Sequence, residues 1–138
     1  MKSVKVVKRV PFEVIADLKL KPEPHTVILN KDKPGGIWWV LCDEHDCILS
    51  IVCVVCRKNE VHFARTFTPV EYRNNGYATA LIGYLSKHVY PNDKLTAHCL
   101  PASVSCYTIA GFQCVAIKEF KHGVQYYMRR DEREHDCK

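Results

Sequence analysis

The stretch that decides the fold is Phe67-Thr68-Pro69-Val70-Glu71-Tyr72-Arg73-Asn74-Asn75-Gly76-Tyr77-Ala78-Thr79, a polar loop between a strand and a helix. After Pro69 the hydrophobic period changes from two residues to 3.6. Gly76 stands where the helix begins, so the first backbone N–H groups have no partner within the helix, and the helix dipole adds partial positive charge. The loop therefore predicts a phosphate or pyrophosphate site.

The same loop also admits an interpretation without a ligand. Asn74 or Asn75 could cap the helix, which would satisfy one of its open N–H groups. The loop is neither a Walker loop nor a dinucleotide fingerprint, because the required lysine and the paired glycines are missing. From these residues alone, both interpretations stay open.

The flanking sequence predicts alternating strands and helices. Ala78, Leu81, Ile82, Leu85 and Val89 form one apolar stripe of a helix that Pro91-Asn92-Asp93 ends. Upstream, strands over 37–42, 47–56 and 61–67 form an antiparallel meander whose middle strand is apolar on both faces. The other expected elements are a basic strand over 2–10, a helix over 12–20, a strand over 94–100, a helix over 103–110 and a hairpin of 112–120 with 124–130.

Composition excludes several classes of protein. With 138 residues, 47% hydrophobic and 25% charged, the chain is expected to fold as one globular domain. The longest apolar run, 48–56, falls far short of the ~20 residues that cross a bilayer, and no secretory signal precedes it. We expect a cytoplasmic protein without a membrane partner. The net charge of +5 is compatible with nucleic acid, but the aromatic residues form no stacking series with the basic ones.

Eight cysteines are too few for a disulfide-stapled secreted domain, so free thiols are expected. Cys53 and Cys56 have the spacing of a metal or redox pair, but they lie in a β-branched run where residues three apart point to opposite faces. We therefore expect buried core thiols and no metal site.

Two motifs resemble those of the GNAT acetyltransferase superfamily. Arg73-Asn74-Asn75-Gly76-Tyr77-Ala78 resembles its pyrophosphate-binding signature, [Q/R]-x-x-G-x-[G/A]. Tyr107-Thr-Ile-Ala-Gly111-Phe112 is similar to the Tyr-x-x-x-Gly-Phe that ends the second conserved helix of these families. The resemblance covers roughly residues 60–120. It implies an α+β fold, a three-layer arrangement in which helices flank a splayed mixed sheet, with residues 1–138 as a single N-acetyltransferase domain.

The resemblance further implies acetyl-CoA as co-substrate, in the V between the strand ending at Phe67 and the strand over 95–100. Backbone groups near Phe67 and Thr68 would pair with the pantetheine, and the amides of 74–79 would hold the pyrophosphate. The implied cofactor-binding residues are Phe67, Thr68, Pro69, Arg73, Asn74, Asn75, Gly76, Tyr77, Ala78 and Thr79. The acceptor amine would enter from the other side of the sheet and attack the thioester directly.

Catalysis needs two residue roles. An aliphatic ammonium with a pKa near 10.4 must lose a proton before it attacks, and the departing thiolate must be stabilised. Tyr107 matches the family tyrosine that donates to the thiolate, although a packing aromatic is the alternative. His62 and His98 are candidate bases, and a water relay is equally open, as is a structural role for each histidine.

Other positions weaken the match to the family. Leu100 replaces the asparagine that usually stands seven residues before the tyrosine. Cys99 and Cys106 could suggest an acetyl-cysteine intermediate, but the sequence places no base beside either thiol.

Acidic residues suggest the acceptor. Asp43, Glu44 and Asp46 share one turn, with Glu60 and Glu71 near other strand ends, so a small amine of the polyamine type is the hypothesis. A protein lysine or N-terminal amine is the alternative, and a non-catalytic module that binds acyl-CoA or nucleic acid is the rival from another class. The hairpin over 112–130 could make a homodimer.

Overall fold

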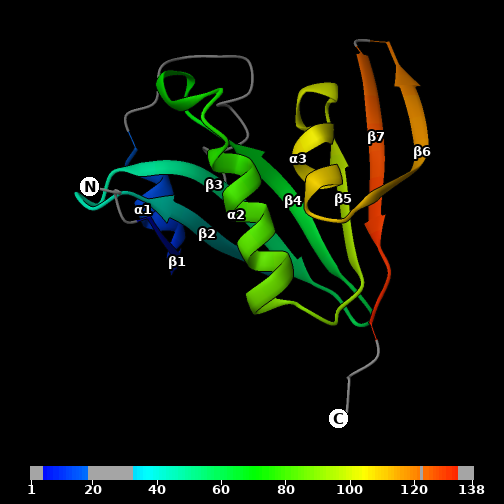
Figure 1. Ribbon diagram of the computed structural model, residues 1–138, viewed down its shortest axis with the longest axis horizontal. Helices are drawn as coiled ribbons and strands as arrows, with labels where there is room; N and C mark the ends of the chain where they lie inside the picture. Colours follow the sequence, from blue (N-terminus) through cyan, green and yellow to red (C-terminus); the bar gives the residue numbers. More distant parts are fainter. Residues whose placement is uncertain (1–4, 19–32, 122, 134–138) are drawn as a thin grey trace.

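The computed structural model describes residues 5–18, 33–121 and 123–133, whose strands join in one mixed seven-stranded sheet (Figure 1). The strand order is β1-β2-β3-β4-β5-β7-β6, with only β4 and β5 parallel. The strands are β1 (Val6–Val10), β2 (Gly36–Cys42), β3 (Ile48–Cys56), β4 (Val61–Phe67), β5 (Leu95–Cys99), β6 (Gln113–Phe120) and β7 (Gly123–Arg130). The α-helices are α1 (Phe12–Ala16), α2 (Tyr77–Tyr84) and α3 (Val104–Ile109).

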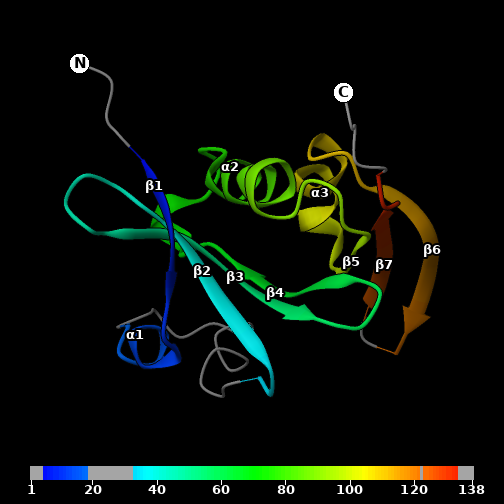
Figure 2. The ribbon, with the colours of Figure 1, turned by 90° about the horizontal axis from the view of Figure 1, so that it is seen from below.

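Helices cover both faces of this sheet. Figure 2 shows α2 and α3 on one face and α1 on the other. Under α2 and α3, the fully buried Leu81, Ile82 and Leu85 pack with residues of the sheet such as Phe63. A second cluster, with Ile15 and Trp38 among its members, fills the space under α1. The expected three-layer α+β fold is therefore confirmed.

The covered position of β3 within the sheet agrees with its apolar composition. Every residue of β3 from Leu49 to Val54 is buried, because helices lie over both of its faces. The meander of β2, β3 and β4 is antiparallel throughout, as the turn residues between the strands predict.

The helix after the glycine loop ends in a wider turn that a buried arginine stabilises. A π-helical turn, η3 (Leu85–Val89), continues α2, and the N–H of Tyr90 donates to the carbonyl of Leu85 at 2.8 Å. From β7, Arg130 donates to the carbonyls of Ser86 (2.6 Å), Tyr90 (2.7 Å) and Asp93 (2.8 Å). One side chain thereby satisfies carbonyls that the end of a helix leaves open.

One expected helix is shorter than predicted. The helix expected over 12–20 is only α1, because the N–H of Leu18 bonds the carbonyl of Ile15, three residues back, and tightens the chain into a turn. Residues 19 and 20 lie outside the described residues, as do residues 2–4 of the basic strand expected over 2–10. The helix expected from 103 is preceded by a 3-10 turn, η4 (Pro101–Ser103).

The thiols are free but not all buried. Cys42, Cys53 and Cys99 are buried, whereas Cys47, Cys56 and Cys114 are exposed and Cys106 is intermediate. The expectation of a buried thiol was therefore wrong for Cys56, which is the exposed last residue of β3. Among the described residues, no group of three His, Cys, Asp or Glu could hold a metal ion. In the same part of the chain, no helix has both the length and the apolar character to cross a membrane.

Candidate active site

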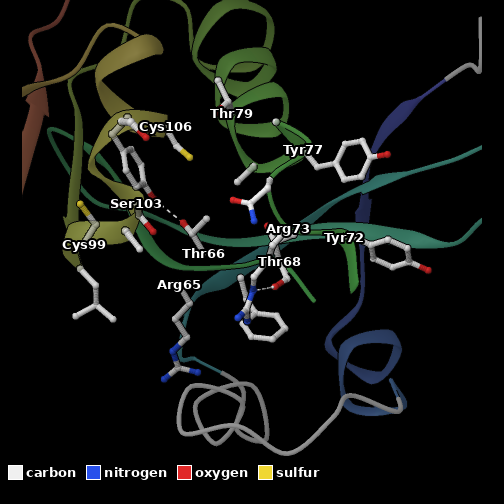
Figure 3. Close-up of a pocket in the computed structure, with 18 of the residues that line it drawn as sticks. Arg65, Thr66, Thr68, Tyr72, Arg73, Tyr77, Thr79, Cys99, Ser103 and Cys106 are labelled. Atoms are coloured by element: carbon white, nitrogen blue, oxygen red, sulfur yellow. Dashed lines mark hydrogen bonds between the residues drawn. The ribbon is translucent and has the colours of Figure 1, made fainter. Parts of the chain in front are cut away.

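The parallel strands β4 and β5 part after a short pairing and leave a cavity between them. They pair only from Val61 with Leu95 to Phe63 with Ala97. Ala64 then forms a β-bulge, because Phe63 and Arg65 face consecutive residues of β3. Beyond the bulge β4 stays with β3 and β5 stays with β7, and a cavity of about 770 Å³ opens between them (Figure 3). This is the V that the resemblance implied.

The glycine loop forms one wall of the cavity. Asn74 (φ 66°) and Gly76 (φ 78°) both have left-handed backbone conformations, and α2 begins at the next residue, Tyr77. No side chain caps α2, so the capping interpretation was wrong. Asn75 instead donates to the carbonyls of Tyr72 and Arg73, both at 3.1 Å. The uncapped N–H groups of the first turn fit an anionic phosphate.

Tyr107 lies deep in the cavity wall formed by α3. Its hydroxyl and that of Thr66 on β4 are hydrogen-bonded at 2.5 Å, as the dashed line in Figure 3 marks. Phe63 and Phe112 hold the ring edge-on, with centroids 6.2 and 5.1 Å away. Burial raises the pKa of Tyr107 well above its usual range, against the opposing effect of the Thr66 hydrogen bond. The hydroxyl therefore keeps its proton and is able to donate a hydrogen bond.

Sequence reasoning missed Thr66. The available signal was its position in strand alternation, which places it on the same face of β4 as the helices that close the cavity.

The two histidines have different surroundings. His98 lines the cavity, whereas His62 is buried beside it, with the two rings edge-on and 4.9 Å apart. The hydroxyl of Thr96 donates to Glu60 at 2.5 Å, so it accepts from Nδ1 of His62 at 2.8 Å. This hydrogen bonding places the His62 proton on Nδ1 and leaves Nε2 as the acceptor.

Both imidazoles are neutral near pH 7. Burial, followed by the charge of Arg57, lowers the pKa of His62 to about 4. The same two effects lower the pKa of His98.

Most of the expected site residues line one cavity. They are Phe67, Thr68, Arg73, Asn74, Gly76, Tyr77, Ala78, Thr79, His98 and Tyr107. Three expected residues lie outside its lining, namely Pro69, Asn75 and His62. Leu100 lines the cavity and is 45% exposed, at the position where the family usually has asparagine. Cys99 and Cys106 also line it, and burial raises the pKa of Cys99 to about 11, which disfavours a nucleophilic thiolate there.

Basic and acidic side chains lie in different places relative to the cavity. Arg65 and Arg73 line the cavity, but no described Asp or Glu does. The acidic residues that suggested a polycation serve other contacts. Asp46 pairs with Lys8 at 3.2 Å, and Asp43 accepts the N–H groups of His45 and Cys47 within its own turn.

The comparison with family models decides the assignment of the chain. A model described as an acetyltransferase (GNAT) domain matches residues 35–129, which include the glycine loop, β4, β5 and α3. The chain belongs to the GNAT acetyltransferase family. It is accordingly an N-acetyltransferase with acetyl-CoA as co-substrate. A search of curated proteins finds no match in sequence.

Solved structures share this GNAT fold at low sequence identity. The ribosomal-protein-S18-alanine N-acetyltransferase of Escherichia coli has a TM-score of 0.67 at 10% identity, covering 98% of this chain and 99% of that one. The spermidine/spermine N-acetyltransferase SpeG of Vibrio cholerae has a TM-score of 0.62 at 14% identity, covering 91% of each chain. A histone acetyltransferase HPA2 and related acetyltransferase from Corynebacterium glutamicum has a TM-score of 0.72 at 12% identity, covering 96% and 99%. At these identities the likeness concerns the fold.

Proposed function

We propose that residues 1–138 act as one domain that acetylates a small primary amine by direct attack in a ternary complex. The observation that carries this proposal is a cavity whose lining comes from both sides of the sheet. The glycine loop and Tyr107 belong to the side of α2 and α3. His98 lies on β5 between Ala97 and Cys99, which are buried toward α2 and α3, so its own side chain faces the other side.

The cavity residues divide the work between them. Acetyl-CoA supplies a thioester-activated acetyl group when it is bound. The uncapped N–H groups of α2 hold the phosphates, and the strand end at Phe67 and Thr68 offers backbone groups to an extended chain. Tyr107, oriented by Thr66, donates a hydrogen bond to the departing sulfur.

The acceptor must lose a proton on the side of the sheet that His98 faces. Of the described histidines, only His98 lines the cavity. We assign to it the role of accepting the proton of the acceptor amine through an intervening water. His62 lies behind His98 with its Nε2 as an acceptor, and its ring is fixed through Thr96 and Glu60. We therefore treat His62 as a positioning residue for His98.

The hypotheses about the class of acceptor differ in what supports them. The carboxylates that favoured a polyamine lie outside the described cavity lining, so the support for a polyamine is the fold shared with SpeG. A protein lysine or N-terminal amine remains the alternative. Family membership favours an enzyme over a non-catalytic module.

Steady-state kinetics test the mechanism. With acetyl-CoA and amine varied together and CoA release measured, intersecting double-reciprocal lines are expected, and parallel lines would indicate an acetyl-enzyme instead. Tyr107→Phe keeps the ring contacts and is expected to lower kcat by about tenfold to a hundredfold, because one hydrogen bond to developing charge is lost. Tyr126→Phe, outside the cavity lining, is the matched control and should leave kcat unchanged. Equal kcat values for wild type and Tyr107→Phe would refute the assigned role.

Two further expectations stay predictions, namely a cytoplasmic location and a homodimer through the β6–β7 hairpin. β6 is an edge strand with exposed Val115 and Ile117, which a second copy could cover. Light scattering after size exclusion should give about twice 15.9 kDa. Ile117→Lys should then give a monomer.

A further inference from the structure

The side of the cavity that receives the acceptor carries positive charge. Arg65 and Arg73 line the cavity, and none of its described lining residues is acidic. His98, which shares this side, has a lowered pKa and adds no charge near pH 7. A polyamine would therefore bring its second ammonium group toward like charges.

Arg65 lies on the opposite side of β4 from the catalytic hydroxyls. Thr66 reaches Tyr107, and Arg65 precedes Thr66 in the strand, where neighbouring side chains point to opposite faces. Figure 3 shows the Arg65 side chain pointing away from Thr66. Arg65, Thr66 and Tyr107 nevertheless all line the same cavity, so a molecule bound there can contact both sides of the strand.

Arg73 is turned toward the same side although it belongs to the phosphate motif. Its Nε donates to the carbonyl of Thr68 at 2.8 Å, and its guanidinium lies 5.5 Å from the centroid of Phe67. Phe67 belongs to the core cluster under α1, on the face opposite α2 and α3. The Arg73 guanidinium thus lies on the acceptor side of the loop.

We propose that the acceptor is a short primary amine that also carries a carboxylate, and that Arg65, with Arg73 on the same side of the cavity, binds this carboxylate. The proposal rests on the proposed function and names the substrate class of the same cavity. A guanidinium presents paired N–H donors that match the two oxygens of a carboxylate. Binding of the carboxylate at Arg65 leaves the amine end of a short molecule to face His98 and the thioester.

A matched substrate series tests this assignment. 4-Aminobutanoate, 1,4-diaminobutane and butylamine have the same chain length, with a carboxylate, an ammonium and a methyl group at the far end. We expect the KM for 4-aminobutanoate to be at least about tenfold lower than for the other two, as one charge-assisted hydrogen bond requires. 3-Aminopropylphosphonate distinguishes carboxylate from phosphonate recognition, and a lower KM for it than for 4-aminobutanoate would overturn the carboxylate assignment.

Variants of Arg65 test the residue itself. Arg65→Gln should raise the KM for 4-aminobutanoate by about tenfold to a hundredfold and leave the KM for acetyl-CoA unchanged. Arg65→Glu should reverse the preference toward 1,4-diaminobutane. Arg129→Gln is the matched control, because Arg129 pairs with Asp131 outside the cavity lining. A raised KM for acetyl-CoA in Arg65→Gln would show that Arg65 serves the phosphates of CoA and would overturn the proposal.

A binding measurement separates this inference from the proposed function. If no amine releases CoA, the proposed function fails, and calorimetry of 4-aminobutanoate with the CoA-saturated protein decides the carboxylate site. Binding by wild type that is lost in Arg65→Gln supports the site. Equal binding by both proteins, preference for the diamine, or no binding overturns it.

Discussion

The glycine loop can be tested by replacing three glycines with alanine, one in the loop and two outside it. Gly76 begins α2 with φ 78°, Gly35 lies outside the cavity lining with φ 73°, and Gly83 lies within α2 without a positive φ. A Cβ at any of the three would meet no atom within 4 Å. Replacement by alanine therefore measures backbone conformation rather than crowding.

The three replacements are expected to change the free energy of unfolding in different directions. Alanine in a left-handed conformation costs about 1–2 kcal/mol, so Gly76→Ala and Gly35→Ala should both lower the free energy of unfolding by about that amount. Gly83→Ala should raise it by about 0.5–1 kcal/mol, because alanine is favoured over glycine inside a helix. At about 3–5 °C per kcal/mol for a chain of this size, the Tm of Gly83→Ala should exceed that of Gly76→Ala by about 5–15 °C.

Acetyl-CoA then separates Gly76 from Gly35. At a concentration of about 100 Kd, the ligand should stabilise wild type, Gly35→Ala and Gly83→Ala by about 2.7 kcal/mol. Gly76→Ala should lose much of this shift, because its methyl group occupies space beside the open N–H groups of α2. Thermal unfolding with and without acetyl-CoA measures both effects. An unchanged ligand shift in Gly76→Ala would refute the phosphate site, and equal Tm values for the three variants would refute the backbone argument.

Two further predictions concern stability. Arg130→Met should lower the free energy of unfolding by about 3 kcal/mol, because three backbone carbonyls lose a charged donor. The control Arg129→Met removes an exposed pair with Asp131 and should lower it by less than about 1 kcal/mol. Urea unfolding compares the two variants, and equal losses would contradict the stabilising role of Arg130. The pKa of His62 falls from 6.5 to about 4 on folding, so below pH 6.5 the unfolded chain takes up a proton that the folded protein does not, and stability should fall by about 2 kcal/mol from pH 6.5 to 5. His62→Asn should flatten this slope in urea unfolding, and an unchanged slope would place the proton uptake elsewhere.

Much of the site was predictable because it is local in sequence. A glycine at the start of a helix, a polar loop before it and an apolar stripe after it are neighbours along the chain, so residues 73–79 could be singled out as a candidate phosphate site, to which the family resemblance added acetyl-CoA. Tyr107 was found through a second local motif. Whether His62 could be the base was harder to judge, because its burial and its bond to Thr96 depend on a strand more than thirty residues away.

The sequence by itself determined the order of the elements and the helix after Gly76, since these depend on residue type and short spacing, and its resemblance to a family signature indicated CoA. Only the tertiary structure decided which charges meet. At the bulge of Ala64, β4 parts from β5, and a cavity that both Arg65 and Thr66 line opens between the two strands. The acidic turn after β2 forms its own local contacts outside the described cavity lining. Net charge and composition do not predict which charged residues line the cavity, because this depends on contacts between strands distant in the chain.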